Sequence, residues 1–245
     1  MKDLTWIKTR LIAHRGLHTI DHSVPENTLA AFQAAIDRGY GIEMDVNALK
    51  DGTVVVFHDK NLERLCGDPR YLRDLTVTDI RGLKILGTDQ TISTLGEVLA
   101  FVAGRVPLLI ELKPFGEYKF LCENVMKAMA GYAGAWAMHS FHPKSVNWFR
   151  VYHPEVIRGQ ISEYFENDDD MNKFVRFAMK HLLFNAITKP DFINYGVRNM
   201  PNKWCDRAQK KGIAVIGFAA RSQEVFDMVR SHYANAVFEF FIPNA

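Results

Sequence analysis

The chain has 245 residues, 48% of them hydrophobic, and its 30 basic residues nearly balance 28 acidic ones. This length can bury the core of one large α/β domain or two small ones. The near-neutral charge, with no long basic run, excludes a nucleic-acid binder that works by neutralising phosphates.

The cysteines and the N-terminal sequence indicate in which cellular compartment the protein is expected. Cys66, Cys122 and Cys205 lie far apart without a Cys-x-x-Cys spacing, which argues against a disulfide framework or a thiolate zinc site. Residues 1–16 carry charges among their apolar residues, unlike a signal peptide, and no later apolar run is long enough to cross a bilayer. We therefore expect a cytoplasmic protein with no transmembrane segment and reduced thiols.

Apolar runs rich in β-forming residues alternate with segments of helical spacing along the whole chain. Strands are predicted at 11–13, 41–46, 106–110, 135–140, 156–161, 182–187, 213–218 and 236–240. Helices are predicted at 28–38, 95–102, 118–129, 145–152, 171–180, 203–210 and 223–229. No composition shift or Pro/Gly-rich linker divides the chain, so we expect residues 1–245 to form a single domain.

A further apolar run at 53–57 follows the second predicted strand, and residues 62–92 are polar and irregular. We interpret approximately 59–92 as an insertion into one strand–helix unit. Eight alternating units favour an α/β fold of the (β/α)8 TIM-barrel type with a small insertion after the second strand, whose functional groups lie at the C-terminal ends of strands. A doubly wound open sheet would more often show five or six strands and a glycine-rich phosphate loop, and the sequence has no such loop.

Charged side chains occupy alternate positions at the ends of two predicted strands. Glu43 and Asp45 point the same way from one strand, and Glu111 and Lys113 do so from the next. Three carboxylates that converge on one barrel mouth would repel one another unless a cation lay among them. Because oxygen ligands suit hard ions, we predict a divalent metal, Ca²⁺ or Mg²⁺.

Two histidines are expected at the same rim. His14 ends the first predicted strand, and His58 ends the run at 53–57. Imidazole can act as a general acid or base near neutral pH, while Arg15 and Lys113 supply positive charge for a bound oxyanion. Together with a metal, these groups describe a phosphate-ester site.

A purely structural interpretation competes with this one. Each histidine alone is more often structural, and Glu43 with Asp45 could form an ion-pair network with nearby cations. Such a network does not explain why ionisable groups gather at strand ends in three successive units. The acidic run Asp168-Asp169-Asp170 is interpreted as a helix N-cap region, not as a metal site.

Five short motifs together resemble the ordered signature of the glycerophosphodiester phosphodiesterase family. They are His14-Arg15-Gly16, Pro25-Glu26-Asn27-Thr28, Glu43-Met44-Asp45-Val46, His58-Asp59 and Glu111-Leu112-Lys113. The segment Ser140-Phe141-His142-Pro143 also resembles the family, so the similarity extends over nearly the full chain. This resemblance implies a TIM barrel that hydrolyses glycerophosphodiesters to glycerol 3-phosphate and an alcohol with the help of Ca²⁺ or Mg²⁺.

The resemblance also implies a role for each matching residue. The metal ligands would be Glu43, Asp45 and Glu111, the acid and base would be His14 and His58 in either order, and the phosphate contacts would be Arg15 and Lys113. Glu26 would support the site or approach the metal through water. Asn27 would help to cap the first helix of the barrel.

The C-terminal part departs from the family pattern. Phe218-Ala219-Ala220-Arg221 stands where the family usually has Trp-Thr-Val-Asn, and Phe240-Phe241-Ile242-Pro243 stands where Thr-Asp usually precedes Tyr-Pro. Phe218 can replace a tryptophan as an apolar wall. We therefore predict a more apolar pocket that prefers a lysophospholipid, as in a lysophospholipase D-like activity, or another unusual headgroup.

Two further functions are weighed against hydrolysis. A catalytically silent relative would bind a phosphodiester or lipid headgroup without cleaving it. A barrel lyase would use Lys113 as a Schiff base, which requires a depressed lysine pKa, whereas Glu111 and Asp45 favour the charged ammonium. The complete set of histidines and carboxylates favours the phosphodiesterase over both.

Overall fold

A computed structural model describes residues 2–166 and 171–244 of the chain. The chain divides into two compact units. The N-terminal unit is Ala13–Trp136, and the C-terminal unit combines Met1–Ile12 with Ala137–Ala245. The single domain expected for residues 1–245 stays a prediction. The acidic run 168–170, interpreted as an N-cap region, lies outside the described residues.

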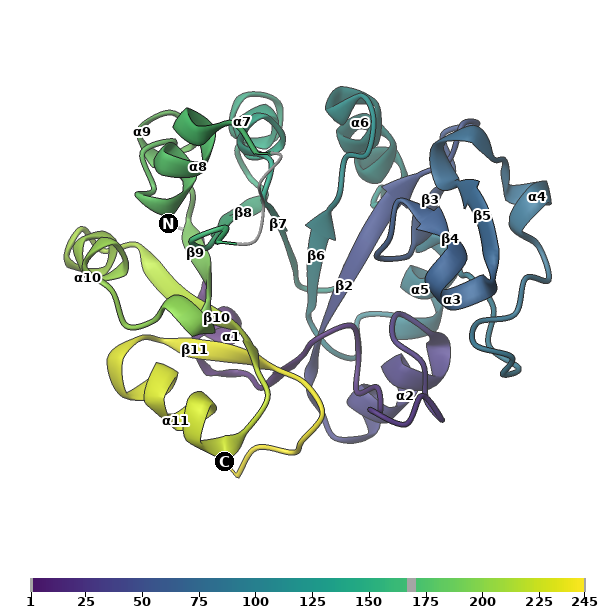
Figure 1. The fold of residues 1–245 in the computed structure, drawn as a ribbon, viewed down its shortest axis with the longest axis horizontal. Helices are drawn as coiled ribbons and strands as arrows, with labels where there is room; N and C mark the ends of the chain where they lie inside the picture. The colour runs from purple at the N-terminus through teal and green to yellow at the C-terminus, as the bar shows by residue number, and fades with distance from the viewer. Residues whose placement is uncertain (1, 167–170, 245) are drawn as a thin grey trace. The chain divides into compact units, whose positions relative to one another are not determined.

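The N-terminal unit is built on two long parallel strands. β2 (Gly41–Ala48) pairs in parallel with β6 (Leu108–Leu112) and antiparallel with the short β3 (Val54–Val56). The short β1 (Ile12–Ala13) pairs with β2. Three helices complete the strand–helix units of this part, and they are α2 (Leu29–Asp37), α5 (Leu95–Val102) and α6 (Tyr118–Ala128). Figure 1 shows β2 and β6 side by side, with β3 at the outer side of β2.

The insertion after the second strand is more ordered than its polar sequence predicts. It contains β4 (Asn61–Leu62), α3 (Glu63–Cys66), β5 (Asp68–Tyr71), η1 (Leu72–Asp74) and α4 (Val77–Ile80), with β4 and β5 antiparallel. Scattered apolar side chains, among them Leu62, Leu72 and Ile80, pack with Phe57 in one buried cluster. These side chains have no regular spacing in sequence, which is why periodicity did not reveal a core here.

The C-terminal unit alternates parallel strands with helices. Its elements are α1 (Thr5–Thr9), β7 (Trp136–Ser140), α7 (Pro143–Tyr152), β8 (Ile157–Ser162), α8 (Lys173–Lys180), α9 (Asn185–Thr188), β9 (Phe192–Gly196), η2 (Val197–Asn199), α10 (Lys203–Lys210), β10 (Ala214–Ala220), α11 (Gln223–His232) and β11 (Asn235–Phe238). The strands β7 to β11 pair in chain order, each parallel to the next. Among the described residues, no helix has the length and apolar character needed to span a membrane.

One predicted strand is wrong. The apolar run 182–187 is helical, because it contains the start of α9, and the strand of this unit is instead β9, Phe192–Gly196. A short apolar run cannot by itself be assigned to a buried strand or to a helix. Leu183 and Ile187 are exposed and only Leu182 is buried, so most of this run lies outside the core.

Candidate active site

The end of β2 places two carboxylates in the interior of the N-terminal unit. Alternation along the strand sends Glu43 and Asp45 to one face, and both are almost fully buried. Asp45 lies opposite Glu111 in the β2–β6 register. One carboxylate oxygen of Glu43 lies within 4.8 Å of one of Glu111. The strand pairing thus brings together the three acidic residues that the sequence singled out.

Asp45 lies between two cations. Its Oδ1 is 3.7 Å from Lys113 Nζ, its Oδ2 is 3.3 Å from Arg15 Nε, and Asn27 Nδ2 donates to Oδ2 at 2.9 Å. Burial alone would raise the pKa of Asp45, but Lys113 and Arg15 hold this pKa well below its usual range. Asp45 is therefore an ionised carboxylate in the interior, stabilised by fixed positive partners.

The pKa of Glu43 is shifted in the direction opposite to that of Asp45. Burial raises the pKa of Glu43 to about 8, with further repulsion from Asp45 and Glu111, while His14 and the Arg15 N–H oppose the rise. A bound cation would relieve this repulsion, and the donors of these three residues are all oxygens. The set therefore fits a hard divalent ion such as Ca²⁺ or Mg²⁺.

The turn after β1 brings His14 and Arg15 to the same carboxylates. The Arg15 N–H donates to Glu43 Oε2 at 3.0 Å, and His14 Nε2 lies 3.8 Å from the same oxygen. Gly16 follows at a φ of 77°, where a Cβ would come within 2.9 Å of Ala31. Glycine is thus required for the chain to turn sharply between the catalytic candidates and α2.

The Pro-Glu-Asn-Thr loop supports this turn. Glu26 Oε1 accepts from Arg15 Nη1 at 2.7 Å. The expectation that Asn27 caps the following helix is wrong, because the Thr28 side chain accepts from the Ala31 N–H and is the N-cap of α2. Asn27 instead binds Asp45 through both its amide nitrogen and its amide oxygen. Asn27 comes one residue before the N-cap, and its short side chain contacts Asp45 of β2 and not the N-terminus of α2.

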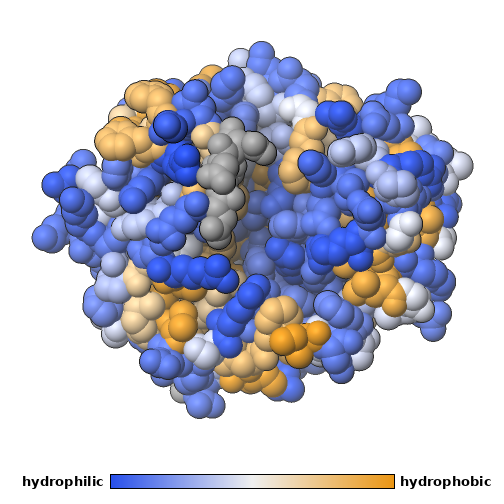
Figure 2. Space-filling model, in the orientation of Figure 1, coloured by the Kyte–Doolittle hydropathy of each residue, from blue (hydrophilic) through white to orange (hydrophobic). Residues whose placement is uncertain are grey.

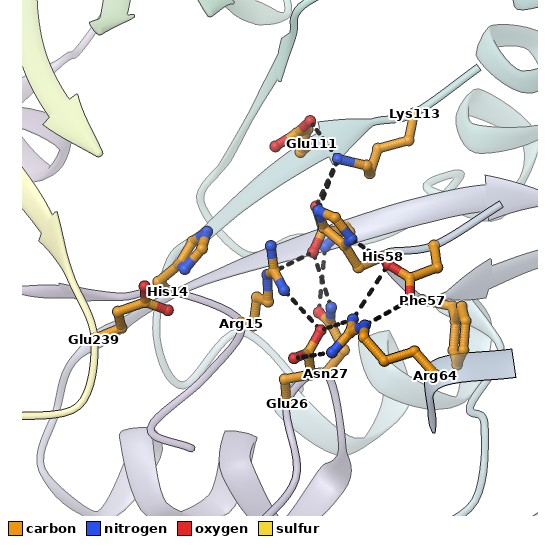
Figure 3. A network of polar contacts seen from close by, with 12 residues as sticks. His14, Arg15, Glu26, Asn27, Phe57, His58, Arg64, Glu111, Lys113 and Glu239 are labelled. Atoms are coloured by element: carbon orange, nitrogen blue, oxygen red, sulfur yellow. Dashed lines mark hydrogen bonds and ion pairs between the residues drawn. The ribbon is translucent and has the colours of Figure 1, made fainter. Parts of the chain in front are cut away.

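His58 follows β3 and is held between an anion and a cation. Its Nδ1 is 2.6 Å from Asp59 Oδ1, and its Nε2 is 3.1 Å from Lys113 Nζ, which also donates to Glu111 Oε1 at 3.1 Å. An ammonium can only donate, so the imidazole Nε2 accepts and the proton is on Nδ1, directed at Asp59. Figure 3 shows His58 between Lys113 and Arg64.

Sequence reasoning missed Arg64, which lies on α3 of the insertion. Its guanidinium donates to both carboxylate oxygens of Glu26, at 2.8 and 2.9 Å, and to Asp59, with Nε 2.7 Å from Oδ2 (Figure 3). Hydrogen bonds from His58 and Arg64 hold the pKa of Asp59 well below its usual range, although burial alone would raise it. Nothing in a single sequence marks this arginine, because its partners come from two separate loops.

Phe218, the remaining predicted site residue, belongs to β10 of the C-terminal unit. Its ring lies 5.6 Å from that of Phe141, which in turn lies 5.9 Å from Phe165, both edge to face. Arg221, which follows β10, donates from Nε to Glu239 Oε1 at 2.5 Å. Where the family pattern has an asparagine, this chain therefore has an arginine that is paired with Glu239.

Solved structures first define the class of fold. A phosphodiesterase from Oleispira antarctica, solved with the product sn-glycerol-3-phosphate, is 20% identical, with a TM-score of 0.80 over 96% of this chain and 94% of that one. A glycerophosphodiester phosphodiesterase from Thermotoga maritima is 24% identical, with a TM-score of 0.71 over 93% of both chains. These likenesses and the parallel strand–helix alternation confirm the predicted (β/α)8 TIM barrel with its insertion after the second strand.

The sequence pattern of the glycerophosphoryl diester phosphodiesterase family matches residues 14–239, and the chain therefore belongs to this family. Among curated relatives, a glycerophosphodiester phosphodiesterase of Caldanaerobacter subterraneus subsp. tengcongensis is 38% identical over 124 residues, which are 50% of this chain and 46% of that protein. Glycerophosphodiester phosphodiesterase 1 of Homo sapiens is 39% identical over 98 residues, 36% of this chain and 29% of that protein. The matched stretches span less than half the length of these two relatives.

Proposed function

We propose that this protein hydrolyses glycerophosphodiesters to glycerol 3-phosphate and an alcohol, with the help of Ca²⁺ or Mg²⁺. The observation that carries the proposal is the buried ionic cluster of the N-terminal unit, in which Asp45 lies between Arg15 and Lys113 with His58 in contact. Membership of the family and the printed activities of the relatives support the substrate class.

Glu43, Asp45 and Glu111 would hold the metal. When bound, the ion would neutralise the phosphodiester and stabilise the charge that develops at phosphorus. The rest of the chemistry falls to the side chains around it. Burial alone would lower the pKa of Arg15, but Asp45 and Glu26 raise it, so the guanidinium stays charged and can orient a phosphate oxygen.

His58 is the better candidate for the base. Its proton is on Nδ1 and is held by Asp59, which leaves the Nε2 lone pair to accept a proton from the attacking hydroxyl. His14, whose Nε2 lies 3.8 Å from Glu43 Oε2, would give a proton to the leaving alkoxide as the P–O bond breaks. With water as the attacking hydroxyl, the bond from its oxygen to phosphorus forms and the bond to the alcohol breaks. His58 gains the proton of the water and His14 loses one to the alcohol, and proton exchange with solvent restores both histidines.

Lys113 has a positioning and electrostatic role in this proposal. Burial alone would lower its pKa, but Glu111 and Asp45 outweigh burial and raise it. A charged ammonium is a poor nucleophile, so the Schiff-base lyase is disfavoured. The same ammonium, hydrogen-bonded to His58 Nε2, can move to a phosphate oxygen when substrate enters.

The aromatic cluster of the C-terminal unit supports a second candidate, a lysophospholipase D-like activity. Phe141 contacts both Phe165 and Phe218 edge to face, so this unit holds an apolar cluster that could contact an acyl chain. In this candidate the same P–O bond to the headgroup alcohol is hydrolysed, and the glycerol that keeps the phosphate carries an acyl chain.

The test is release of glycerol 3-phosphate from glycerophosphodiesters, and of lysophosphatidate from lysophospholipids, before and after EDTA, and again after addition of Ca²⁺ or Mg²⁺. We expect release to stop with EDTA, to return with the metal, and to be absent in His58→Ala. Equal rates on glycerophosphocholine and a lysolipid would argue against the apolar pocket. Metal binding without any release would indicate a catalytically silent relative.

A further inference from the structure

The C-terminal unit exposes an unusual number of large apolar side chains on two consecutive helices. On α8, Phe174 is 71% and Phe177 is 54% exposed, and Leu183 and Ile187, before and within α9, are 49% and 58% exposed. Single exposed apolar residues are common, but several large ones on two consecutive helices are typical of an interaction site. We call these four side chains the α8–α9 patch.

The local structure explains why these side chains face outward. Asn172 caps α8 by accepting from the Phe174 and Val175 N–H groups, and the helix buries Ala178 and Met179. Phe174 and Phe177 are three residues apart and therefore share a face of the helix. Figure 2 shows hydrophobic surface beside hydrophilic surface in the region where Figure 1 places α8 and α9.

Within the segment that carries the patch, the charged side chains have one sign. Residues 173–189 contain Lys173, Arg176, Lys180 and Lys189 and no acidic residue. On α10, Lys203 and Arg207 stack on Trp204, whose ring is 4.3 Å from His181, and His181 is 4.0 Å from Phe177. The pKa of His181 is lowered by burial and then by Lys180 and Lys203, in keeping with a positive local field.

We propose that the α8–α9 patch docks the protein on the surface of an anionic lipid bilayer. Exposed Phe, Leu and Ile side chains would enter the boundary between headgroups and acyl chains, and the lysines and arginines would bind anionic headgroups. Trp204 beside them is of the kind that favours a membrane interface. The proposal rests on this surface and not on the proposed reaction.

The charges also argue against the main competing occupant, a second copy of the chain. A twofold dimer brings the same patch together from both copies, so the lysines would face lysines with no acidic partner from this segment. Lysine is also depleted in protein interfaces. An anionic bilayer satisfies both the apolar and the basic part of the patch.

The experiment is sedimentation of the full chain with sucrose-loaded vesicles of phosphatidylcholine, with and without phosphatidylglycerol. We expect binding to the anionic vesicles only. Loss of one inserted phenyl group should weaken partitioning roughly tenfold in Phe174→Ala. The matched control is Phe120→Ala, which removes a phenylalanine that is 40% exposed on α6 of the other unit and should bind like the wild type.

A charge test separates electrostatic from apolar contributions. Lys173→Glu with Lys189→Glu should abolish binding at low salt, whereas Lys119→Glu with Lys127→Glu on α6 should leave it unchanged. The proposal is overturned if the wild type ignores anionic vesicles, or if patch and control variants bind equally. It is also overturned if Phe174→Ala converts a dimer to a monomer in sedimentation velocity, which would assign the patch to a second copy. None of these outcomes depends on whether the protein cleaves phosphodiesters.

Discussion

The two units of this protein place different chemistry at the ends of their strands. In the N-terminal unit, β2 and β6 carry Asp45 and Glu111, which are paired with Arg15 or Lys113. In the C-terminal unit, Phe141 follows β7, Phe165 follows β8 and Phe218 lies in β10. One region thus concentrates paired charges, and the other concentrates aromatic contacts.

This difference explains why a function is easier to infer from the sequence of the N-terminal unit than from that of the C-terminal unit. Buried charge costs free energy unless it is paired, so a fold retains it mainly where chemistry or specificity requires it. A buried phenylalanine is stabilising anywhere in a core and carries no such signal. The comparison predicts that substitutions in the ionic region affect the rate and those in the aromatic region affect substrate preference.

The largest effect is expected for the proposed base. His58→Ala should lower kcat for glycerophosphocholine roughly 10²- to 10⁴-fold, as expected for loss of general base catalysis, with little change in circular dichroism. The matched control is His232→Ala, which removes an exposed histidine from α11 of the C-terminal unit and should keep the wild-type rate. A His58→Ala enzyme of normal rate would remove this residue from the chemistry.

The ion-pair network should also appear in the acid stability. Burial would raise the pKa of Glu26, but Arg64 and Arg15 lower it from 4.5 to about 2. A depressed carboxylate pKa stabilises the fold above the unfolded pKa, and this contribution is lost as the pH falls from 4.5 towards 2. It amounts to about 3 kcal/mol.

Urea unfolding of wild type and Glu26→Gln measures this contribution. The free energy of unfolding should be larger for the wild type than for the variant at pH 6, and the difference between them should shrink steadily below pH 4.5. A gap that stayed constant with pH would show that the glutamate charge is not the source of the difference.

A smaller effect on the rate is expected for Arg64. Arg64→Ala frees Asp59 and Glu26, so the orientation of His58 should loosen and kcat should fall roughly tenfold to a hundredfold. Because Arg64 acts through Asp59 on the proposed base His58, the acidic limb of the pH–rate profile should shift as well. Arg73→Ala, in the same insertion but 61% exposed, is the control. If the two variants had identical kinetics, the contacts of Arg64 would be surface ion pairs without a role in the reaction.

The smallest effect is expected in the aromatic region. Phe218→Ala should raise KM for a lysophospholipid roughly fivefold, the loss of about 1 kcal/mol of apolar and ring contact, and leave kcat unchanged. KM for glycerophosphocholine should change much less. A fall in kcat on both substrates would contradict the division of labour between the two regions.

Periodicity and motif order predicted much of the architecture. The predicted helices 95–102 and 203–210 coincide with α5 and α10, because each begins at a capping residue, Thr94 or Asn202, followed by a regular apolar face. The strand predicted at 182–187 failed because a short apolar run does not distinguish a strand from a turn that leads into a helix, and Leu183 and Ile187 are exposed. The insertion was underestimated because its apolar residues are irregularly spaced.

The sequence predicted the part of the site that follows from regular spacing along the strands. Glu43, Asp45, Glu111 and Lys113 come together because strand alternation and register are regular, so their shared face follows from spacing. The contacts of Asn27 and Arg64 depend on the conformation of loops. Positive φ angles, such as 56° at Asn27, are not encoded by any periodic pattern.

The central claim is that the acidic strand ends of the N-terminal unit form a divalent cation site. Calorimetric titration of EDTA-treated protein with Ca²⁺ and with Mg²⁺ tests it directly, with Glu111→Ala beside the control Glu155→Ala, an exposed glutamate that follows α7. We predict binding in the wild type and in Glu155→Ala, and loss of binding in Glu111→Ala. A wild type that binds neither ion, or two variants that bind equally well, would contradict the account.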